Sequence, residues 1–221
     1  RDDVESRGLG DVYKRQSMVN GTSEFVNQLA IAITTIVFNR SALLFAGEDG
    51  VAAVSIIMYL QFLCIGIYFG FSMGLSTPLG YAYGDRNFSV CRVLEKYAYR
   101  FFAIAPIILY GCTYLLAPIG VYFFASPGST VFDMAVSGLR LYGLGFLFSG
   151  INIFAAIRMM TYGKGYISGM ITFLRSFALL LLFLTVLPRF LELNGIWLAV
   201  PAAEILTLIV ALWTLRKKTV A

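Results

Sequence analysis

The chain has 221 residues, of which 59% are hydrophobic and only 13% are charged, and its mean hydropathy is +0.79. Soluble domains hold about 45–50% apolar and about 25% charged residues, so this composition is typical of a helical membrane protein. The sequence contains no histidine, which excludes Ser-His and Cys-His catalytic sites and zinc hydrolases with histidine ligands. The three cysteines lack the spacing of a metal site or a disulfide framework, so no metal site is predicted.

Residues 1–16 differ in composition from the rest of the chain. They carry four basic and four acidic residues and no apolar periodicity. The string SRGLGDVYKRQ resembles a translated sequencing-adapter read, so we expect residues 1–16 to be a non-native tail and leave them out of the fold prediction. The protein proper is then residues 17–221, and we expect it to be a fragment whose natural N-terminus is missing.

Six apolar stretches follow, each long enough to cross a bilayer core, which takes about 20 residues. They are residues 25–47, 50–84, 101–132, 134–157, 165–188 and 193–215. The connectors between them contain turn residues, as in Ser126-Pro127-Gly128-Ser129. The stretches do not alternate polar and apolar residues as membrane barrels do. The sequence therefore predicts an all-α membrane protein in which six transmembrane helices form one bundle over residues 17–221.

Lysine and arginine gather in alternate connectors, and cytoplasmic loops hold an excess of these residues. The second and fourth connectors with their flanks and the C-terminal end hold Arg86, Arg92, Lys96, Arg100, Arg158, Lys164, Arg216, Lys217 and Lys218. The remaining connectors hold only Arg189. We therefore expect a multi-pass protein of the cell's inner (plasma) membrane with both ends in the cytoplasm. The net charge of +5 is explained by this topology, so no nucleic-acid partner is expected.

Two ionisable residues lie deep in the last two stretches. At 1.5 Å per residue, Arg175 and Glu204 are roughly 15 Å and roughly 13 Å from the start of their stretches, near the midplane. A charge there costs about 2.5–3.5 kcal/mol on insertion scales and must face protein or water. Because the two stretches are consecutive and antiparallel, we predict an Arg175–Glu204 ion pair. Either this pair only neutralises two charges, or Glu204 belongs to a proton or cation path.

Further polar residues lie within or at the mouths of the stretches. Glu24 opens the first stretch, where it either complements the helix N-terminus or faces a cavity. Asn27 and Gln28 follow about one turn later, and Asn39, Gln61 and Asn152 lie further along. Together these side chains can line a wet cleft that opens to the cytoplasm.

The remaining features of the stretches are predicted to serve packing. Arg40 lies near the outer end of the first stretch and is expected to extend to the headgroups. Arg140 and Asp133 share a helix face and can hold the outer half of the fourth stretch against a neighbour. The stripe at Gly66, Gly70 and Gly74 predicts close approach of another helix.

Several short strings occur in an order and spacing that resemble a known family. They are Asn20-Gly21, Ser23-Glu24-Phe25, Ala46-Gly47-Glu48-Asp49-Gly50, Tyr83-Gly84-Asp85-Arg86-Asn87, Gly150-Ile151-Asn152, Gly163-Lys164, Leu174-Arg175, Gly195-Ile196-Trp197 and Ala203-Glu204. This set resembles the multidrug and toxic compound extrusion (MATE) transporters, in particular the C-terminal half of the MepA-like bacterial branch.

The resemblance implies two six-helix bundles that face each other across a central cavity, with this chain as the second bundle and an N-terminal six-helix lobe as its missing partner. It also implies an antiporter in which proton or sodium influx drives export of organic cations or amphiphilic drugs. Glu24, Asn27, Gln28, Asn152 and Glu204 are then the expected cation- or substrate-binding residues. Protonation or cation binding at such a carboxylate releases a cationic cargo. No cofactor is implied besides the coupling ion.

Two other functions remain open from the sequence. A lipid-linked saccharide flippase of the same superfold requires a basic cavity, which Arg40, Arg140 and Arg175 can supply as anion sites. A non-catalytic membrane scaffold requires no polar site at all. An intramembrane enzyme is not expected, because no stretch contains an aspartyl or Ser-Lys catalytic pair.

Overall fold

The structure is a computed structural model that describes the backbone of residues 2–216 and the side chains of residues 29–215. Apart from short connectors, this part of the chain is helical. The helices are α1 (Asp2–Gly84), α2 (Phe88–Tyr122), α3 (Thr130–Tyr142), α4 (Phe146–Thr161), α5 (Gly165–Phe173), α6 (Leu179–Val186) and α7 (Pro188–Arg216). The 3-10 turn η1 (Gly143–Gly145) joins α3 to α4, and the π-helical turn η2 (Leu174–Ala178) joins α5 to α6.

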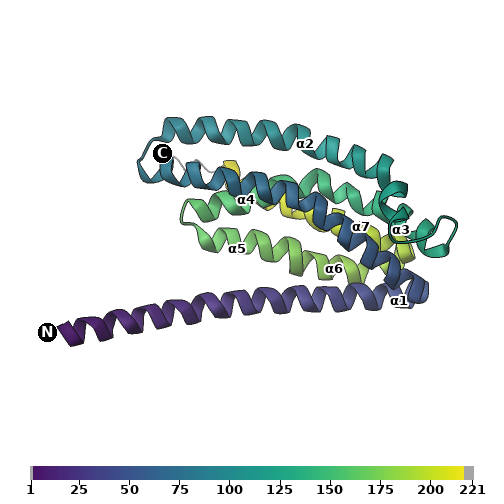
Figure 1. Ribbon diagram of the computed structural model, residues 1–221, viewed down its shortest axis with the longest axis horizontal. Helices are drawn as coiled ribbons and strands as arrows, with labels where there is room; N and C mark the ends of the chain where they lie inside the picture. The colour runs from purple at the N-terminus through teal and green to yellow at the C-terminus, as the bar shows by residue number, and fades with distance from the viewer. Residues whose placement is uncertain (1, 217–221) are drawn as a thin grey trace.

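Among the described residues, five helical segments are long and apolar enough to cross a membrane, where the sequence predicted six. They are Leu29–Gly84, Phe88–Tyr122, Thr130–Thr161, Gly165–Val186 and Pro188–Leu215. The counts differ because α1 contains the first two predicted stretches. Gly47 has φ 62° and ψ −153°, a backbone conformation that is essentially restricted to glycine. At this residue α1 folds back on itself, which gives a first arm (residues 29–46) and a second arm (residues 48–84) (Figure 1).

A second reversal lies within α7, where Glu192 has φ 49° and ψ −129°. Each break is followed three residues later by a glycine that packs against preceding backbone. A Cβ on Gly50 would lie 2.8 Å from the carbonyl oxygen of Ala42, and one on Gly195 would lie 2.5 Å from that of Leu187. Both reversals therefore depend on a residue without a side chain, because any Cβ would overlap backbone that cannot rotate away.

The reversals and connectors are sorted between the two ends of the bundle. The α1–α2 and α4–α5 connectors and the C-terminal end of α7 lie at one end, while the reversal within α1, the α2–α3 connector and the start of α7 lie at the other (Figure 1). The basic connectors of the sequence thus share one end of the molecule. Their placement in the cytoplasm stays a prediction.

The predicted start of the third stretch at residue 101 is wrong, because α2 begins at Phe88. Asn87 caps this helix, since its Oδ1 accepts a hydrogen bond of 3.3 Å from the backbone N–H of Val90. The charged residues 92–100 therefore lie on the first turns of α2 and not in a connector. Hydropathy marks the apolar run, whereas the helix is defined by backbone hydrogen bonds that continue past charged side chains.

The core lies around α3, α4 and α7, and α4 belongs to the most buried of the apolar segments. Trp197 of α7 is only 1% exposed and packs on Gly138 of α3, where an added Cβ would lie 2.8 Å from the indole ring. Gly150 of α4 receives the ring of Phe102 in the same way. Small residues on α3 and α4 thus let aromatic rings from neighbouring helices fill the bundle.

The glycine stripe is not packed as the sequence predicted. Gly66, Gly70 and Gly74 of α1 are exposed, and a Cβ at each would meet nothing within 4 Å. The stripe lies on the outward side of the second arm, because Tyr68 and Ser72 hold the inward side and are 0% and 1% exposed. Within the described part of the chain, no helix packs against these three glycines.

An ion pair that the sequence analysis did not predict joins α2 to α4. The Nε of Arg158 donates to Glu95 Oε1 at 2.5 Å, and the hydroxyl of Tyr162 donates to the same oxygen at 2.6 Å. The Arg158 guanidinium also lies over the Tyr162 ring, 5.1 Å from its centroid. Arg158 and Glu95 are 3% and 9% exposed. Glu95 and Arg158 lie on regular α-helix and Tyr162 caps the C-terminal end of α4, so this cluster fixes the relative position of α2 and α4.

Replacing Gly195 by alanine tests the second reversal. The new Cβ would lie 2.5 Å from the carbonyl carbon of Leu187 and 2.6 Å from the nitrogen of Pro188, so the backbone must shift. We expect a loss of about 1–3 kcal/mol in the free energy of unfolding, seen as a lower melting temperature in detergent. Gly169→Ala is the matched control, because its Cβ enters open space on α5. A Gly195→Ala variant that melts with the wild type would contradict this packing.

The Glu95–Arg158 pair is tested by a double-mutant cycle on thermal unfolding. Glu95→Gln leaves the buried guanidinium of Arg158 without its counter-charge, which should cost about 3–5 kcal/mol. The variant with both Glu95→Gln and Arg158→Gln removes both charges and should recover much of this loss. If the loss in the double variant equals the sum of the losses in Glu95→Gln and in Arg158→Gln alone, the two side chains do not interact.

Candidate functional site

One face of α7 is built from small residues and carries a single carboxylate. Ala199, Ala203, Thr207 and Ala211 recur at helical spacing and are at most 1% exposed. Glu204 lies beside Ala203 on this face and is 4% exposed. Because the neighbouring side chains are short, α4 can approach α7 closely and remove the carboxylate from solvent. Such a group requires a partner, since an isolated buried charge is very unfavourable.

The partner of Glu204 is Arg175, which η2 places at the middle of the α5–α6 segment. The Nη2 of Arg175 donates to Glu204 Oε1 at 2.5 Å, and its Nε lies 3.1 Å from Oε1 and 3.3 Å from Oε2. The two side chains are 12% and 5% exposed. The structure therefore brings together the two residues that the sequence paired across consecutive antiparallel stretches.

Asn152 of α4 contacts Glu204 from the other side. Its Nδ2 donates to Glu204 Oε2 at 2.7 Å and to the backbone carbonyl of Glu204 at 2.9 Å. Asn152 is fully buried, and its Oδ1 has no hydrogen-bond partner. Asn152 and Glu204, both predicted binding residues, are thus in contact, with one amide oxygen left over as an acceptor.

The other predicted binding residues are not part of this arrangement as described. The side chains of Glu24, Asn27 and Gln28 lie outside the described residues, so their roles stay predictions. Gln61, on the second arm of α1, accepts a hydrogen bond from the hydroxyl of Tyr142. It therefore faces α3, whereas Asn152 faces α7.

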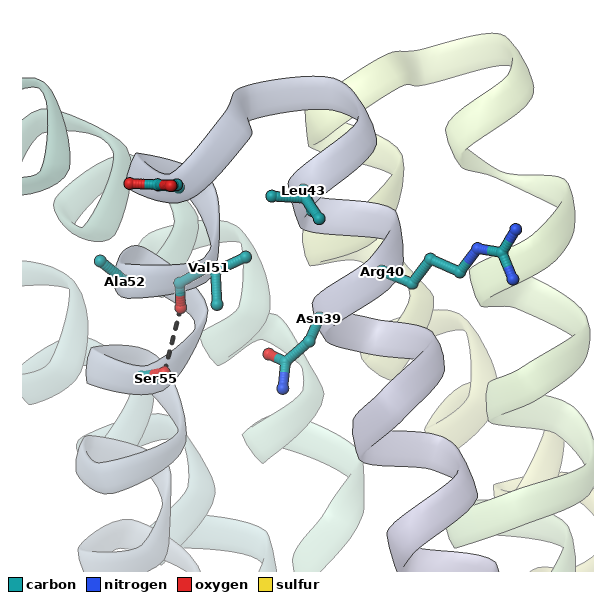
Figure 2. Close-up of a pocket in the computed structure, with 7 residues that line it drawn as sticks. Asn39, Arg40, Leu43, Val51, Ala52 and Ser55 are labelled. Atoms are coloured by element: carbon teal, nitrogen blue, oxygen red, sulfur yellow. Dashed lines mark hydrogen bonds between the residues drawn. The ribbon is translucent and has the colours of Figure 1, made fainter.

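Asn39 lies at a separate groove between the two arms of α1. This open groove has a volume of about 580 Å³ and is lined by Asn39, Arg40, Leu43, Glu48, Val51, Ala52 and Ser55. Asn39 and Leu43 point into the space between the arms, and Arg40 points away from it (Figure 2). The polar residues Asn39, Gln61 and Asn152 thus have different surroundings. The prediction that they line one cleft is wrong for these three residues.

The three arginines of the stretches do not converge on one cavity. Arg40 is exposed, as expected for a side chain near the outer end. Arg140 donates from Nε to the carbonyl of Tyr114 at 3.3 Å, and its guanidinium lies over the Tyr114 ring at 4.8 Å. It therefore holds α3 against α2 without Asp133, which lies in the first turn of α3. Arg175 is neutralised by Glu204.

Sequence reasoning missed Glu95 as a buried group, because it was counted within a charged connector. One signal was available: Glu95 is the only acidic residue between Arg92 and Arg100, in a region whose other charges are basic. Arg158 was interpreted only as a topology signal. The pairing itself required the fold, since 63 residues separate the two positions.

The Glu204 site can hold one positive charge in a surrounding of low polarity. Its carboxylate and the free Asn152 Oδ1 are acceptors, so the groups that fit are a proton, an alkali-metal ion or an organic cation, with Arg175 as the present occupant. Among the described residues, no three Cys, Asp or Glu side chains come close enough to hold a metal ion together.

Solved structures of transporters share this fold. An outward-facing multidrug resistance MATE family transporter of the MOP superfamily matches with a TM-score of 0.78 and 23% identity over 88% of this chain. A MOP superfamily transporter from Pyrococcus furiosus, whose reverse polarity of the binding pocket suggests a different function, matches equally well. A MATE structure in complex with MaL6 matches with a TM-score of 0.79 and 22% identity over 88% of this chain.

The chain spans 44% of the length of each of these three structures. No curated protein matches it. The family model described as MatE matches residues 25–187, which is most of the chain. Members of this family are transporters and not enzymes. This match agrees with a bundle of long apolar helices, and the chain therefore belongs to the MatE family of membrane transporters.

Proposed function

We propose that the chain is the C-terminal lobe of a secondary active multidrug efflux antiporter of the MepA-like bacterial branch. In this proposal the bundle crosses the membrane six times, with the two arms of α1 as separate crossings and both ends in the cytoplasm. Organic cations or amphiphilic drugs are exported in exchange for protons or sodium ions. Residues 1–16 are a non-native tail that takes no part in this function.

The observation that carries the proposal is the buried carboxylate of Glu204. It lies about midway along α7, between a cation on η2 and an amide on α4. A buried carboxylate attracts a lipophilic cation, and binding of a proton or sodium ion at the same group removes that attraction. Exchange of the two cations at one carboxylate is the elementary step of antiport. Asn152 orients the carboxylate, and Glu24, Asn27 and Gln28 are proposed to extend the binding surface.

Two features support a partner lobe of similar size. The chain spans 44% of the solved transporters that it resembles. The stripe at Gly66, Gly70 and Gly74 is exposed with open space above it, although small residues at this spacing serve close helix contact in membranes. An N-terminal six-helix lobe facing this bundle would supply the missing half of the transport cavity.

The alternative functions have less support. A flippase for lipid-linked saccharides needs several unpaired arginines around a pyrophosphate, whereas Arg175 is already neutralised and Arg140 is engaged by Tyr114. A non-catalytic scaffold has no use for Glu204, which is costly to bury. The antiporter is therefore the function that the geometry supports best.

The first test is to read the DNA upstream of residue 17 in the source. We expect an open reading frame that continues into six further apolar stretches, which together with this chain encode the complete transporter. An upstream region that encodes no hydrophobic stretches would contradict the proposal, because the bundle would then lack its partner lobe.

The second test measures ethidium efflux from vesicles that contain the complete transporter and carry either a proton or a sodium gradient. Glu204→Gln keeps the size of the side chain but removes its charge, so efflux should fall to the level of empty vesicles. Efflux with only one of the two gradients identifies the coupling ion. Asp85→Asn, an exposed acid in the α1–α2 connector, is the control and should transport as the wild type does. Undiminished efflux by Glu204→Gln would exclude this carboxylate from transport.

A further inference from the structure

The turn that carries Arg175 is the one π-helical segment in the described part of the chain. In η2 the backbone N–H of Leu179 donates to the carbonyl of Leu174, five residues earlier. None of the five residues of η2 is buried. A π-helical turn holds one extra residue, and such single turns inside α-helices are frequently found at functional sites. Conversion of η2 to a regular α-helix would rotate Arg175 by about 100° around the axis relative to α6, away from its present direction.

Glu204, in contrast, is held in place without Arg175. The single Nδ2 of Asn152 bonds both the carboxylate and the backbone carbonyl of Glu204, so the side chain is fixed to its own helix. Asn152 is fully buried on α4. If Arg175 leaves, the carboxylate therefore stays where it is and is joined by the unpartnered Asn152 Oδ1. The groups then left without a partner, the Glu204 carboxylate oxygens facing Arg175 and the Asn152 Oδ1, are acceptors, so the site must take up another cation.

The second buried ion pair, Glu95–Arg158, is held more rigidly than the Arg175–Glu204 pair. Glu95 and Arg158 both lie on regular α-helix, and Tyr162 engages the pair twice, through its hydroxyl and through its ring. Arg158 is 3% exposed. The side chain of Arg175 is 12% exposed, and among the described residues its guanidinium has no cation–π contact like that of Arg158. Only the Arg175–Glu204 pair thus combines a fixed anion with a cation on an irregular turn.

We propose that Arg175 is an internal counter-cation that occupies Glu204 between transport events and is displaced from it, with a rearrangement of η2, when the transported cation binds. This inference rests on the proposed function, in which Glu204 is the cation-binding carboxylate. It explains how a buried carboxylate stays neutralised at every step, because Arg175, the coupling ion or the cargo is always paired with it.

A hydrogen bond connects η2 to the first arm of α1, so a rearrangement of η2 also affects that arm. The carbonyl of Ser176 in η2 accepts a long hydrogen bond of 3.4 Å from the hydroxyl of Thr34, which is buried on the first arm of α1. The same hydroxyl also donates to Ala30 at 2.8 Å. Movement of η2 changes the hydrogen bond between Ser176 and Thr34, so displacement of Arg175 alters the packing of the first arm of α1.

The test is equilibrium binding of tetraphenylphosphonium to the complete transporter in nanodiscs at one fixed pH and ionic strength. A site that is occupied by Arg175 most of the time binds the cation weakly. Its apparent affinity is the intrinsic affinity multiplied by the fraction of time that the site is free. Arg175→Gln should therefore tighten binding by about tenfold or more, and Arg175→Lys should restore wild-type affinity. A pair that is only structural predicts the opposite, a loss of binding and stability in Arg175→Gln.

Three further variants separate the possible failures. Glu204→Gln should abolish binding, and if it does not, the proposed function fails together with this inference. If Glu204→Gln abolishes binding but Arg175→Gln does not tighten it, the internal counter-cation alone is refuted. The variant with both Arg175→Gln and Glu204→Gln carries no unpaired charge and shows whether the bundle folds without the pair. Glu95→Gln, which removes the carboxylate of the other pair, should leave the affinity of the folded protein unchanged.

Hydrogen–deuterium exchange gives a readout that does not depend on affinity. Saturating tetraphenylphosphonium should change exchange at the amides of residues 174–179, since displacement of Arg175 rearranges the backbone hydrogen bonds of η2. The amides around Arg158 should not respond. Unchanged exchange in residues 174–179 upon binding would overturn the proposed displacement.

Discussion

The requirement that a buried charge has a partner governs the interior of this bundle. Between hydrocarbon-facing helices no water can solvate a carboxylate or a guanidinium, so each must meet an opposite charge or a set of hydrogen bonds. Two pairs meet this requirement among the described residues, Arg175–Glu204 and Arg158–Glu95. Both depend on α4, which supplies Asn152 to the first pair and Arg158 to the second. These two positions are about 9 Å apart along the helix, so one central helix connects the two charged layers.

The two pairs use similar chemistry on different backbones. The Arg158–Glu95 pair lies at the end with the basic connectors, on regular helices, and is enclosed by Tyr162. The Arg175–Glu204 pair lies within the bundle and depends on a π-helical turn. A regular α-helix resists rotation of a single residue because every backbone group is bonded in register. The extra residue of a π-helical turn relaxes that constraint, which makes the second pair the more suitable place for exchange of one cation for another.

The similarity to solved transporters at 22–23% identity is understandable in these terms. The fold of a helical membrane bundle is specified by the length of apolar stretches, by small residues where helices meet, and by glycines where the chain reverses. Gly50, Gly138 and Gly195 each lie where an added Cβ would be within 2.8 Å of other atoms. Much of the remaining surface faces lipid and tolerates exchange among apolar residues. A common fold and different cargo are therefore compatible.

The class of protein, the apolar segments and the residues that had to be neutralised were all predictable from the residues alone. Hydropathy is summed along the chain, so it located the helices, but it placed the start of α2 at residue 101 and not at 88, because a charged side chain does not end a helix. Spacing and depth also sufficed to pair Arg175 with Glu204, since both lie in consecutive antiparallel segments. The Glu95–Arg158 pair, the exposed glycine stripe and the contact of Asn152 with Glu204 became evident only in the folded bundle. Each depends on the rotation of one helix against another, which is fixed by packing among distant segments and is not encoded in any local run of residues.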